Sequence, residues 1–149
     1  ATHPNSRHPS FAKLLSRNLQ YSKLSNVSKL FDATNTSIVG IGVPCCLSAT
    51  SRKFLAIGTS LSNIVLFEVG VRLHKLLQPD ETVSYGAAVS LDISRDNKYM
   101  VCGFANGALT LWDLNYFSIA KTIPSSSGQP ITKVAFCSDT YSEFISTDL

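Results

Sequence analysis

The chain has little charge and no long apolar run. Charged residues make up 15% of its 149 residues and apolar residues 44%, which suits a folded domain with a core and argues against a disordered chain. Its apolar runs are only a few residues long, too short for a membrane-spanning helix of about 20 residues. The polar first ten residues lack the apolar core of a secretory signal. The sequence therefore predicts a cytoplasmic protein.

Motifs for metal or redox chemistry are missing as well. The four cysteines, Cys45, Cys46, Cys102 and Cys137, contain no CxxC pair and have no histidine near them, which excludes the usual zinc ligand sets. We expect buried free thiols rather than disulfides. The sequence predicts no metal and no cofactor.

Catalytic patterns are absent too. His74 is the single histidine of the predicted folded part, and no nucleophile motif accompanies it. Asp80 and Glu81 lie in a proline-containing loop. Asp92 and Asp96 flank a turn. We expect all four carboxylates to be solvated turn residues rather than an acid/base pair, so the sequence predicts no catalytic residue and no enzyme.

Positive charge is concentrated at the N-terminus. The first 31 residues contain five basic side chains and no acidic one, whereas the rest contains eight basic and ten acidic residues, a net charge of −2. A basic leader of this kind suits a nucleic acid or an anionic membrane, and it equally suits a plain solvated segment. Both interpretations stay open at this point.

Helical periodicity is confined to the first 39 residues. Residues 1–10 are predicted to be a disordered leader, and residues 11–39 a helical or irregular lead-in. One amphipathic pattern covers residues 11–19, with apolar residues at i, i+3, i+4 and i+8. A second covers residues 24–31. The apolar positions of the two patterns are Phe11, Leu14, Leu15 and Leu19, then Leu24, Val27, Leu30 and Phe31.

From residue 40 onward the periodicity is that of strands. Val89, Leu91 and Ile93 alternate with polar residues, which is typical of a half-buried strand. Asn106-Gly107 separates two apolar runs, a strong hairpin signal because both residues tolerate positive φ. The runs predict strands at residues 53–58, 64–69, 89–93, 99–102, 109–112 and 119–123, with a loop at 124–130.

These strands repeat at an offset of 45 residues. A four-stranded propeller blade has a period of about 40–45 residues, and a single such sheet needs neighbours to cover both of its faces. A third copy begins at residue 130 and stops before its third strand. We therefore predict an all-β chain, a partial β-propeller of about two and a half WD-repeat-like blades after a short helical leader. The blades are expected at about residues 43–80, 87–124 and 130–149, within a propeller segment of residues 40–149.

A few residues carry the repeat. Trp112-Asp113 matches the dipeptide that ends the third strand of a WD-repeat blade, with the indole expected between blades and the carboxylate at a turn. Because Leu73 rather than glycine precedes His74, we do not expect the His–Asp network of strict WD repeats. The repeat residues are Gly58, Phe67, Gly103, Asn106, Gly107, Trp112 and Asp113.

Two stretches resemble a known family more specifically. Residues 54–67 and 100–114 resemble the N-terminal propeller of the vacuolar protein sorting-associated protein 8 family, and Cys102-Gly-Phe-Ala-Asn-Gly107 is the most distinctive part. The resemblance covers about residues 40–149. The sequence departs from the family at Leu61-Ser62, where the family tends to have His-Gly, which leaves the conformation of that hairpin open.

The resemblance implies a protein-interaction scaffold. It implies a subunit of the endosomal tethering complex CORVET, whose subunits engage an early-endosomal Rab GTPase and bring endosomal membranes together before fusion. The expected partners are tethering-complex subunits and this Rab, without nucleic acid. The expected location is peripheral on early endosomes, in transport to the vacuole or lysosome, and no residue is assigned as the Rab contact. The alternatives are another WD-repeat adaptor, or a binder of anionic membranes or nucleic acids through the basic leader. We also expect the segment to fold poorly when isolated, because open blade edges expose unpaired backbone.

Overall fold

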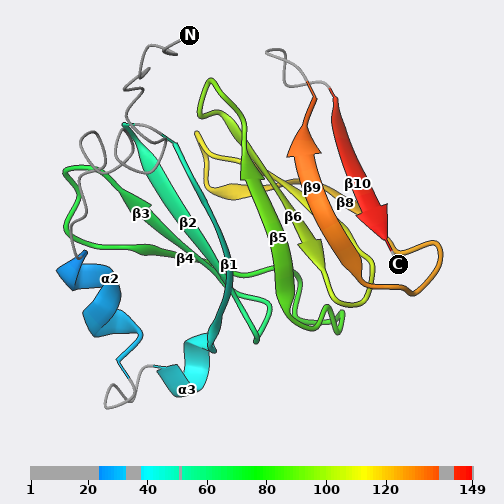
Figure 1. The fold of residues 1–149 in the computed structure, drawn as a ribbon, viewed down its shortest axis with the longest axis horizontal. Helices are drawn as coiled ribbons and strands as arrows, with labels where there is room; N and C mark the ends of the chain where they lie inside the picture. Colours follow the sequence, from blue (N-terminus) through cyan, green and yellow to red (C-terminus); the bar gives the residue numbers. More distant parts are fainter. Residues whose placement is uncertain (1–23, 33–37, 51, 138–142, 149) are drawn as a thin grey trace, which may run out of the picture.

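Three antiparallel sheets stand side by side (Figure 1). The computed structural model describes residues 24–32, 38–50, 52–137 and 143–148, so the predicted leader over residues 1–10 and the predicted helix over 11–19 lie outside the described part. In each sheet, every strand pairs with its neighbour in the sequence. This meander topology confirms the prediction of an all-β partial propeller.

The sheets are called blades 1, 2 and 3, in chain order. Blade 1 consists of β1 (Pro44–Ala49), β2 (Phe54–Thr59), β3 (Ile64–Glu68) and β4 (Lys75–Leu77). Blade 2 consists of β5 (Ala88–Ile93), β6 (Tyr99–Phe104), β7 (Leu109–Asp113) and β8 (Ser118–Ile123). Blade 3 has β9 (Ile131–Phe136) and β10 (Phe144–Asp148). The short helices α2 (Ser25–Leu30) and α3 (Ile38–Ile41) precede blade 1.

The lead-in helices are attached to blade 1. Leu24 and Val27 of the second apolar pattern line a groove together with Leu55 and Phe67 of blade 1. The side-chain amide of Asn63 donates to the carbonyl of Ile41 at 3.0 Å, which ties the end of α3 to the β2–β3 hairpin. A hydrogen bond thus joins α3 to blade 1, whereas α2 lies beside blade 1 across the groove.

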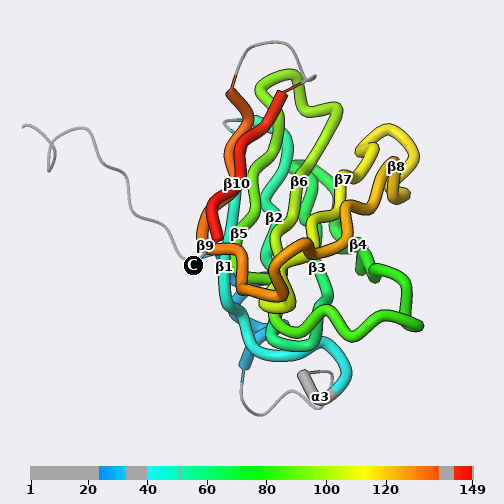
Figure 2. The backbone as a smooth tube through the Cα atoms, turned by 90° about the vertical axis from the view of Figure 1, so that its right-hand side faces the viewer, coloured from blue at the N-terminus to red at the C-terminus, as the bar shows by residue number. Residues whose placement is uncertain are grey.

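The first strands of the three blades form the inner layer. Figure 2 shows β1, β5 and β9 on one side and the outer strands β4 and β8 on the other. Side chains on one inner strand accept hydrogen bonds from the next inner strand. Ser48 Oγ accepts from the Ile93 amide at 3.3 Å, and Ser90 Oγ accepts from the Val134 amide at 3.0 Å. These bonds set the position of each blade relative to the next.

Asp92 belongs to the same set of contacts. Its Oδ2 accepts a hydrogen bond from the Phe136 amide at 2.7 Å, across the boundary between blades 2 and 3. Asp92 occupies the position in β5 that Ser48 has in β1, because Asp92 pairs with Val101 and Ser48 with Ala56. The prediction that Asp92 is a solvated turn residue is therefore wrong, because its strand lies beside β9.

Removing the Asp92 carboxylate should loosen blade 3. Hydrogen bonds to charged groups contribute about 1.5–3 kcal/mol, so we expect Asp92→Ala to destabilise the β5–β9 contact by about that amount. Hydrogen exchange of the Phe136 segment in the full-length protein measures the effect. Glu81→Ala, which removes an exposed carboxylate from a turn, is the control. Equal exchange in the two variants would show that the Asp92 bond contributes nothing.

The cores lie between blades, not within one sheet. Along β6, Met100, Cys102 and Phe104 belong to the core shared with blade 1, while Val101 belongs to the core shared with blade 3. Both faces of β6 are therefore buried, and a single blade could not bury its own apolar residues. The core between blades 1 and 2 also contains Phe54, Ala56, Ile64, Leu66, Leu77, Tyr85, Ala88, Leu91, Ile93, Ala108, Trp112 and Leu114.

The four cysteines are free thiols in different surroundings. Cys102 is buried and Cys46 is half-buried, but Cys45 and Cys137 are exposed, so the expectation of buried thiols is wrong for these two. Cys45 and Cys46 are neighbours on β1, so their side chains face opposite ways, and Cys46 is the one that bonds to Ala88 of β5. Cys137 is exposed because it lies beyond the end of β9. Burial raises the pKa of the Cys46 thiol to about 11 and the pKa of Cys102 well above its ordinary value, so both stay protonated at neutral pH.

Candidate protein-interaction site

The Asn106-Gly107 hairpin joins β6 to β7 and is held at its tip. The Gly107 amide donates to the Phe104 carbonyl at 3.0 Å, the Phe104 amide donates to the Ala108 carbonyl at 3.0 Å, and Gly107 has φ +88°. This is a turn followed by one left-handed residue, so only the glycine of the predicted pair needs positive φ. The Asn106 side chain donates to the Ser84 carbonyl at 3.0 Å, which anchors the tip to the β4–β5 loop.

The equivalent hairpin of blade 1 keeps the same shape without glycine. Ser62, 45 residues before Gly107, has φ +63°. Its hydroxyl donates to the Gly86 carbonyl at 2.6 Å, which compensates for a backbone conformation that non-glycine residues rarely adopt. The β2–β3 hairpin, whose conformation the sequence left open at Leu61-Ser62, therefore has the same left-handed residue as the β6–β7 hairpin of blade 2.

Gly58 and Gly103 lie where adjacent blades approach closely. A Cβ atom at Gly58 would stand 2.8 Å from the Ala88 Cβ, and one at Gly103 would stand 2.8 Å from the Ile131 Cβ. Both distances are below the separation that two carbon atoms tolerate. The two glycines occupy the same position in successive blades and admit the first strand of the following blade.

Trp112 and Asp113 perform different tasks at the end of β7. Trp112 is 2% exposed in the core between blades 1 and 2, and its indole N–H donates to the Thr110 hydroxyl at 2.9 Å. The Asp113 carboxylate accepts from the Asn115 amide at 2.8 Å and caps the β7–β8 turn. His74 lies against the Phe67 ring, with centroids 5.7 Å apart. The Trp112 indole is thus bonded within its own strand.

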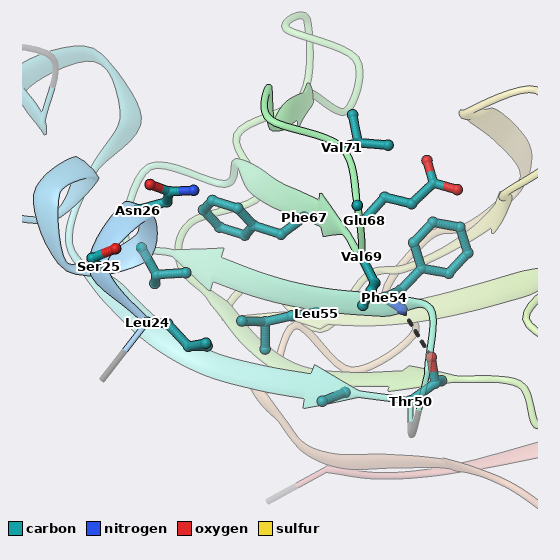
Figure 3. A pocket seen from close by; sticks show the side chains of 13 residues that line it. Leu24, Ser25, Asn26, Thr50, Phe54, Leu55, Phe67, Glu68, Val69 and Val71 are labelled. Atoms are coloured by element: carbon teal, nitrogen blue, oxygen red, sulfur yellow. Dashed lines mark hydrogen bonds between the residues drawn. The ribbon is translucent and has the colours of Figure 1, made fainter. Parts of the chain in front are cut away.

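A groove lies on the face of blade 1 that points away from blade 2 (Figure 3). Its volume is about 490 Å³. Phe67 has the position in β3 that Trp112 has in β7, because it pairs with Leu55 as Trp112 pairs with Met100. Trp112 packs against the preceding blade, whereas Phe67 faces α2. The helix therefore covers part of the face on which the repeat would place another blade.

The described residues contain no clustered metal ligands. No group of three or more His, Cys, Asp or Glu side chains comes together among them, and no helix in the described ranges is long and apolar enough to cross a membrane. Asp80 is exposed, and hydrogen bonds from the Thr82 amide and hydroxyl lower the pKa of its carboxyl group. The turns between the strands therefore offer a partner hydrogen bonds, charged groups and a few apolar side chains.

The predicted repeat residues lie in blades 1 and 2, and sequence reasoning missed several contacts between the blades. Asn106, Gly107 and the Trp112-Asp113 pair lie at one hairpin and the adjoining strand, while Gly58 and Phe67 lie in blade 1. Ser90 and Asp92, which join the inner strands, were not recognised as contact residues. The available signal is the pair of polar residues at alternate positions of β5, a pattern that is equally typical of solvent exposure.

Two solved structures have a similar fold, and one of them is a beta-propeller domain. The beta-propeller domain of Myceliophteria thermophila Cps50 (Swd1) has a TM-score of 0.61 and 18% sequence identity, over 72% of this chain and 33% of that one. A chain of the mitotic checkpoint complex has a TM-score of 0.60 and 19% identity, over 70% of this chain and 31% of that one. Identities this low establish the fold alone.

Sequence relatives point to one family. The homologs of vacuolar protein sorting-associated protein 8 from Mus musculus and Homo sapiens are 30% and 29% identical to this chain, over 104 and 106 residues. Each match covers 68% of this chain, which spans about 7% of the length of either relative. The model of the Vps8 beta-propeller family matches residues 17–149, which confirms the resemblance found in the sequence. This chain therefore belongs to the Vps8 beta-propeller family.

Proposed function

We propose that this propeller segment is a protein-interaction scaffold of a Vps8-type subunit that acts in endosomal tethering. The proposal rests on the way in which the blades stack. Stacking buries both faces of blade 2, so the turns at its two ends and its exposed outer strand β8 are the surface that blade 2 leaves for partners. Family membership supports the assignment to a Vps8-type subunit.

The second part of the proposal concerns the partners. Other CORVET subunits and an early-endosomal Rab GTPase are the proposed ligands, and the subunit would reside peripherally on early endosomes through them. No catalytic role is proposed. Binding of anionic membranes or nucleic acids through residues 1–31 is the alternative from a different class.

The test compares the full-length parent protein with a version that lacks residues 40–149. Partners recovered from cell extract are identified by mass spectrometry, and limited proteolysis of the remaining chain checks that it stays folded. Loss of the Rab or of CORVET subunits supports the proposal. Undiminished recovery of both contradicts it. A version without residues 1–31 serves as the second arm, and salt-sensitive loss of binding to acidic vesicles or RNA in that arm alone would favour the alternative.

A further inference from the structure

The two ends of the blades carry charges of opposite sign. The end with the β1–β2, β3–β4, β5–β6 and β7–β8 turns, here called the basic end, has the β5–β6 turn at the top of Figure 1. Six exposed cations lie there, Arg52, Lys53, Arg72, Lys75, Arg95 and Lys98. At the opposite end the described turns, residues 60–63, 78–87, 105–108 and 124–130, contain Asp80 and Glu81 and neither Lys nor Arg.

The separation between the ends preserves this difference in charge. Strands of five or six residues span about 17–20 Å at ~3.3 Å per residue. Exposed charges are screened over about 8 Å at physiological salt. A partner at one end therefore experiences mainly the charge of that end.

Two carboxylates of the basic end are engaged in their own turns. Asp96 Oδ1 accepts from the Ser94 hydroxyl at 2.7 Å and from the Lys98 amide at 3.2 Å. Asp113 Oδ1 accepts from the Asn115 amide at 2.8 Å. These two carboxylates stabilise turn backbone but keep their negative charge, and Glu68 at the end of β3 adds a third, so the six cations of the basic end outnumber its carboxylates by six to three.

Two of the cations are positioned by aromatic rings. Lys53 Nζ lies 5.0 Å from the centre of the Phe54 ring, and Lys75 Nζ lies 4.3 Å from the centre of the Phe117 ring. The two rings meet edge to face at 6.5 Å, across the boundary between blades 1 and 2. Cation–π contacts restrict the motion of both ammonium groups, which lowers the entropy lost when they bind a carboxylate.

Exposed apolar side chains stand among these cations. Val69, Val71 and Leu73 of the β3–β4 turn are 72%, 49% and 79% exposed, and Tyr116 of the β7–β8 turn is 80% exposed. Apolar and aromatic anchors surrounded by charged groups are the usual composition of a protein-binding surface.

We propose that the basic end of blades 1 and 2 binds an acidic segment of a protein partner. Carboxylates of that segment bind Lys53, Arg72 and Lys75, and an apolar side chain packs on the β3–β4 turn or on Tyr116. The inference rests on the proposed scaffold function and assigns it to one end of the blades. We favour a protein over an anionic membrane because the two lysines held on aromatic rings have restricted positions that suit discrete carboxylates, whereas the exposed Leu73 and Tyr116 would suit either ligand.

Photo-crosslinking in the full-length parent protein tests the surface. Benzoylphenylalanine replaces Tyr116 at the basic end or Val83 at the acidic end, and crosslinked segments are identified by mass spectrometry. Crosslinks from position 116 to segments with an excess of Asp and Glu support the inference. Crosslinks to segments without that excess, or to lipid alone, overturn it. Protein crosslinks from position 83 only would overturn it and still leave the scaffold function standing, whereas no protein crosslink at either position would count against both.

A charge-reversal pair tests the chemistry. We expect Arg72→Glu with Lys75→Glu to weaken binding of a synthetic peptide of the crosslinked segment about tenfold or more, and to reduce the salt dependence of binding. Lys121→Glu with Lys133→Glu, exposed mid-strand positions on β8 and β9, makes the same charge change away from the basic end and should alter binding less than about twofold. Arg72→Glu alone is the variant that leaves the Phe117 contact intact. Equal affinities of the two double variants would overturn the inference, as would stronger binding to phosphatidylserine vesicles than to the peptide.

Discussion

Replacing Gly103 with valine should separate blade 3 from blade 2. A Cβ at this position would stand 2.8 Å from the Ile131 Cβ and would also meet the Val134 side chain. Both neighbours lie on β9, a strand already fixed by hydrogen bonds to Ser90 and Asp92. Overpacking a tight core costs about 1–3 kcal/mol, and the two further methyl groups of valine place the expected destabilisation at the upper end of that range.

The measurement is hydrogen exchange of β6 and β9 in the full-length protein. We expect faster exchange in both strands for Gly103→Val and a smaller increase for Gly103→Ala. Gly40→Ala is the matched control, because a Cβ at Gly40 would meet nothing within 4 Å. A helical Gly→Ala change at an open position is neutral or mildly stabilising. Unchanged exchange in Gly103→Val would show that β9 does not approach β6 as closely as described.

Truncating Trp112 should destabilise the core between blades 1 and 2 by about 3–5 kcal/mol, the usual cost of removing a buried Trp side chain. The indole is 2% exposed and packs in the same core as Phe54, Leu77 and Met100. Trp112→Ala leaves a cavity there and also removes the donor to the Thr110 hydroxyl, a buried group. An unpaired buried hydroxyl adds to the loss.

Two further variants separate these effects. Trp112→Phe retains a ring but loses the N–H donor, so its destabilisation should be about 1–2 kcal/mol. Tyr116→Ala is the control, because this aromatic side chain is 80% exposed only four residues away. Proteolytic stability of the full-length protein, measured with cleavage sites in blade 2, reports the differences. Equal resistance of Trp112→Ala and Tyr116→Ala would contradict the assignment of Trp112 to the core.

Strand periodicity predicted most of blade 2 but not all of blade 1. The predicted strands at 99–102 and 109–112 lie within β6 and β7, because apolar residues fill both faces of these buried strands. β1 and β4 were missed. The hydropathy of Pro44–Ala49 does not follow its burial, since the apolar Leu47 is 67% exposed whereas Cys46 and Ser48 contact β5. Lys75–Leu77 is too short to show a period.

The contacts between blades were beyond the reach of single-strand patterns. The alternating pattern around Asp92 predicts an exposed residue, yet its carboxylate accepts a hydrogen bond from the Phe136 amide, 44 residues away. Ser62 lacks the glycine signal of its hairpin, and its left-handed backbone is held by the Gly86 carbonyl of a distant loop. A hydrogen bond between elements far apart in the chain leaves no periodic trace in either element.

The sequence by itself determined the architecture of this protein, because a repeat of 45 residues with alternating strands has to stack its blades to cover both faces of each sheet. It also determined the family, through residues 100–114 above all. Only the tertiary structure decided which polar residues join the blades and where the charges gather. Arg52, Lys75 and Lys98 are scattered along the chain, and they meet at one end because every second turn of an antiparallel meander returns to the same edge of its sheet.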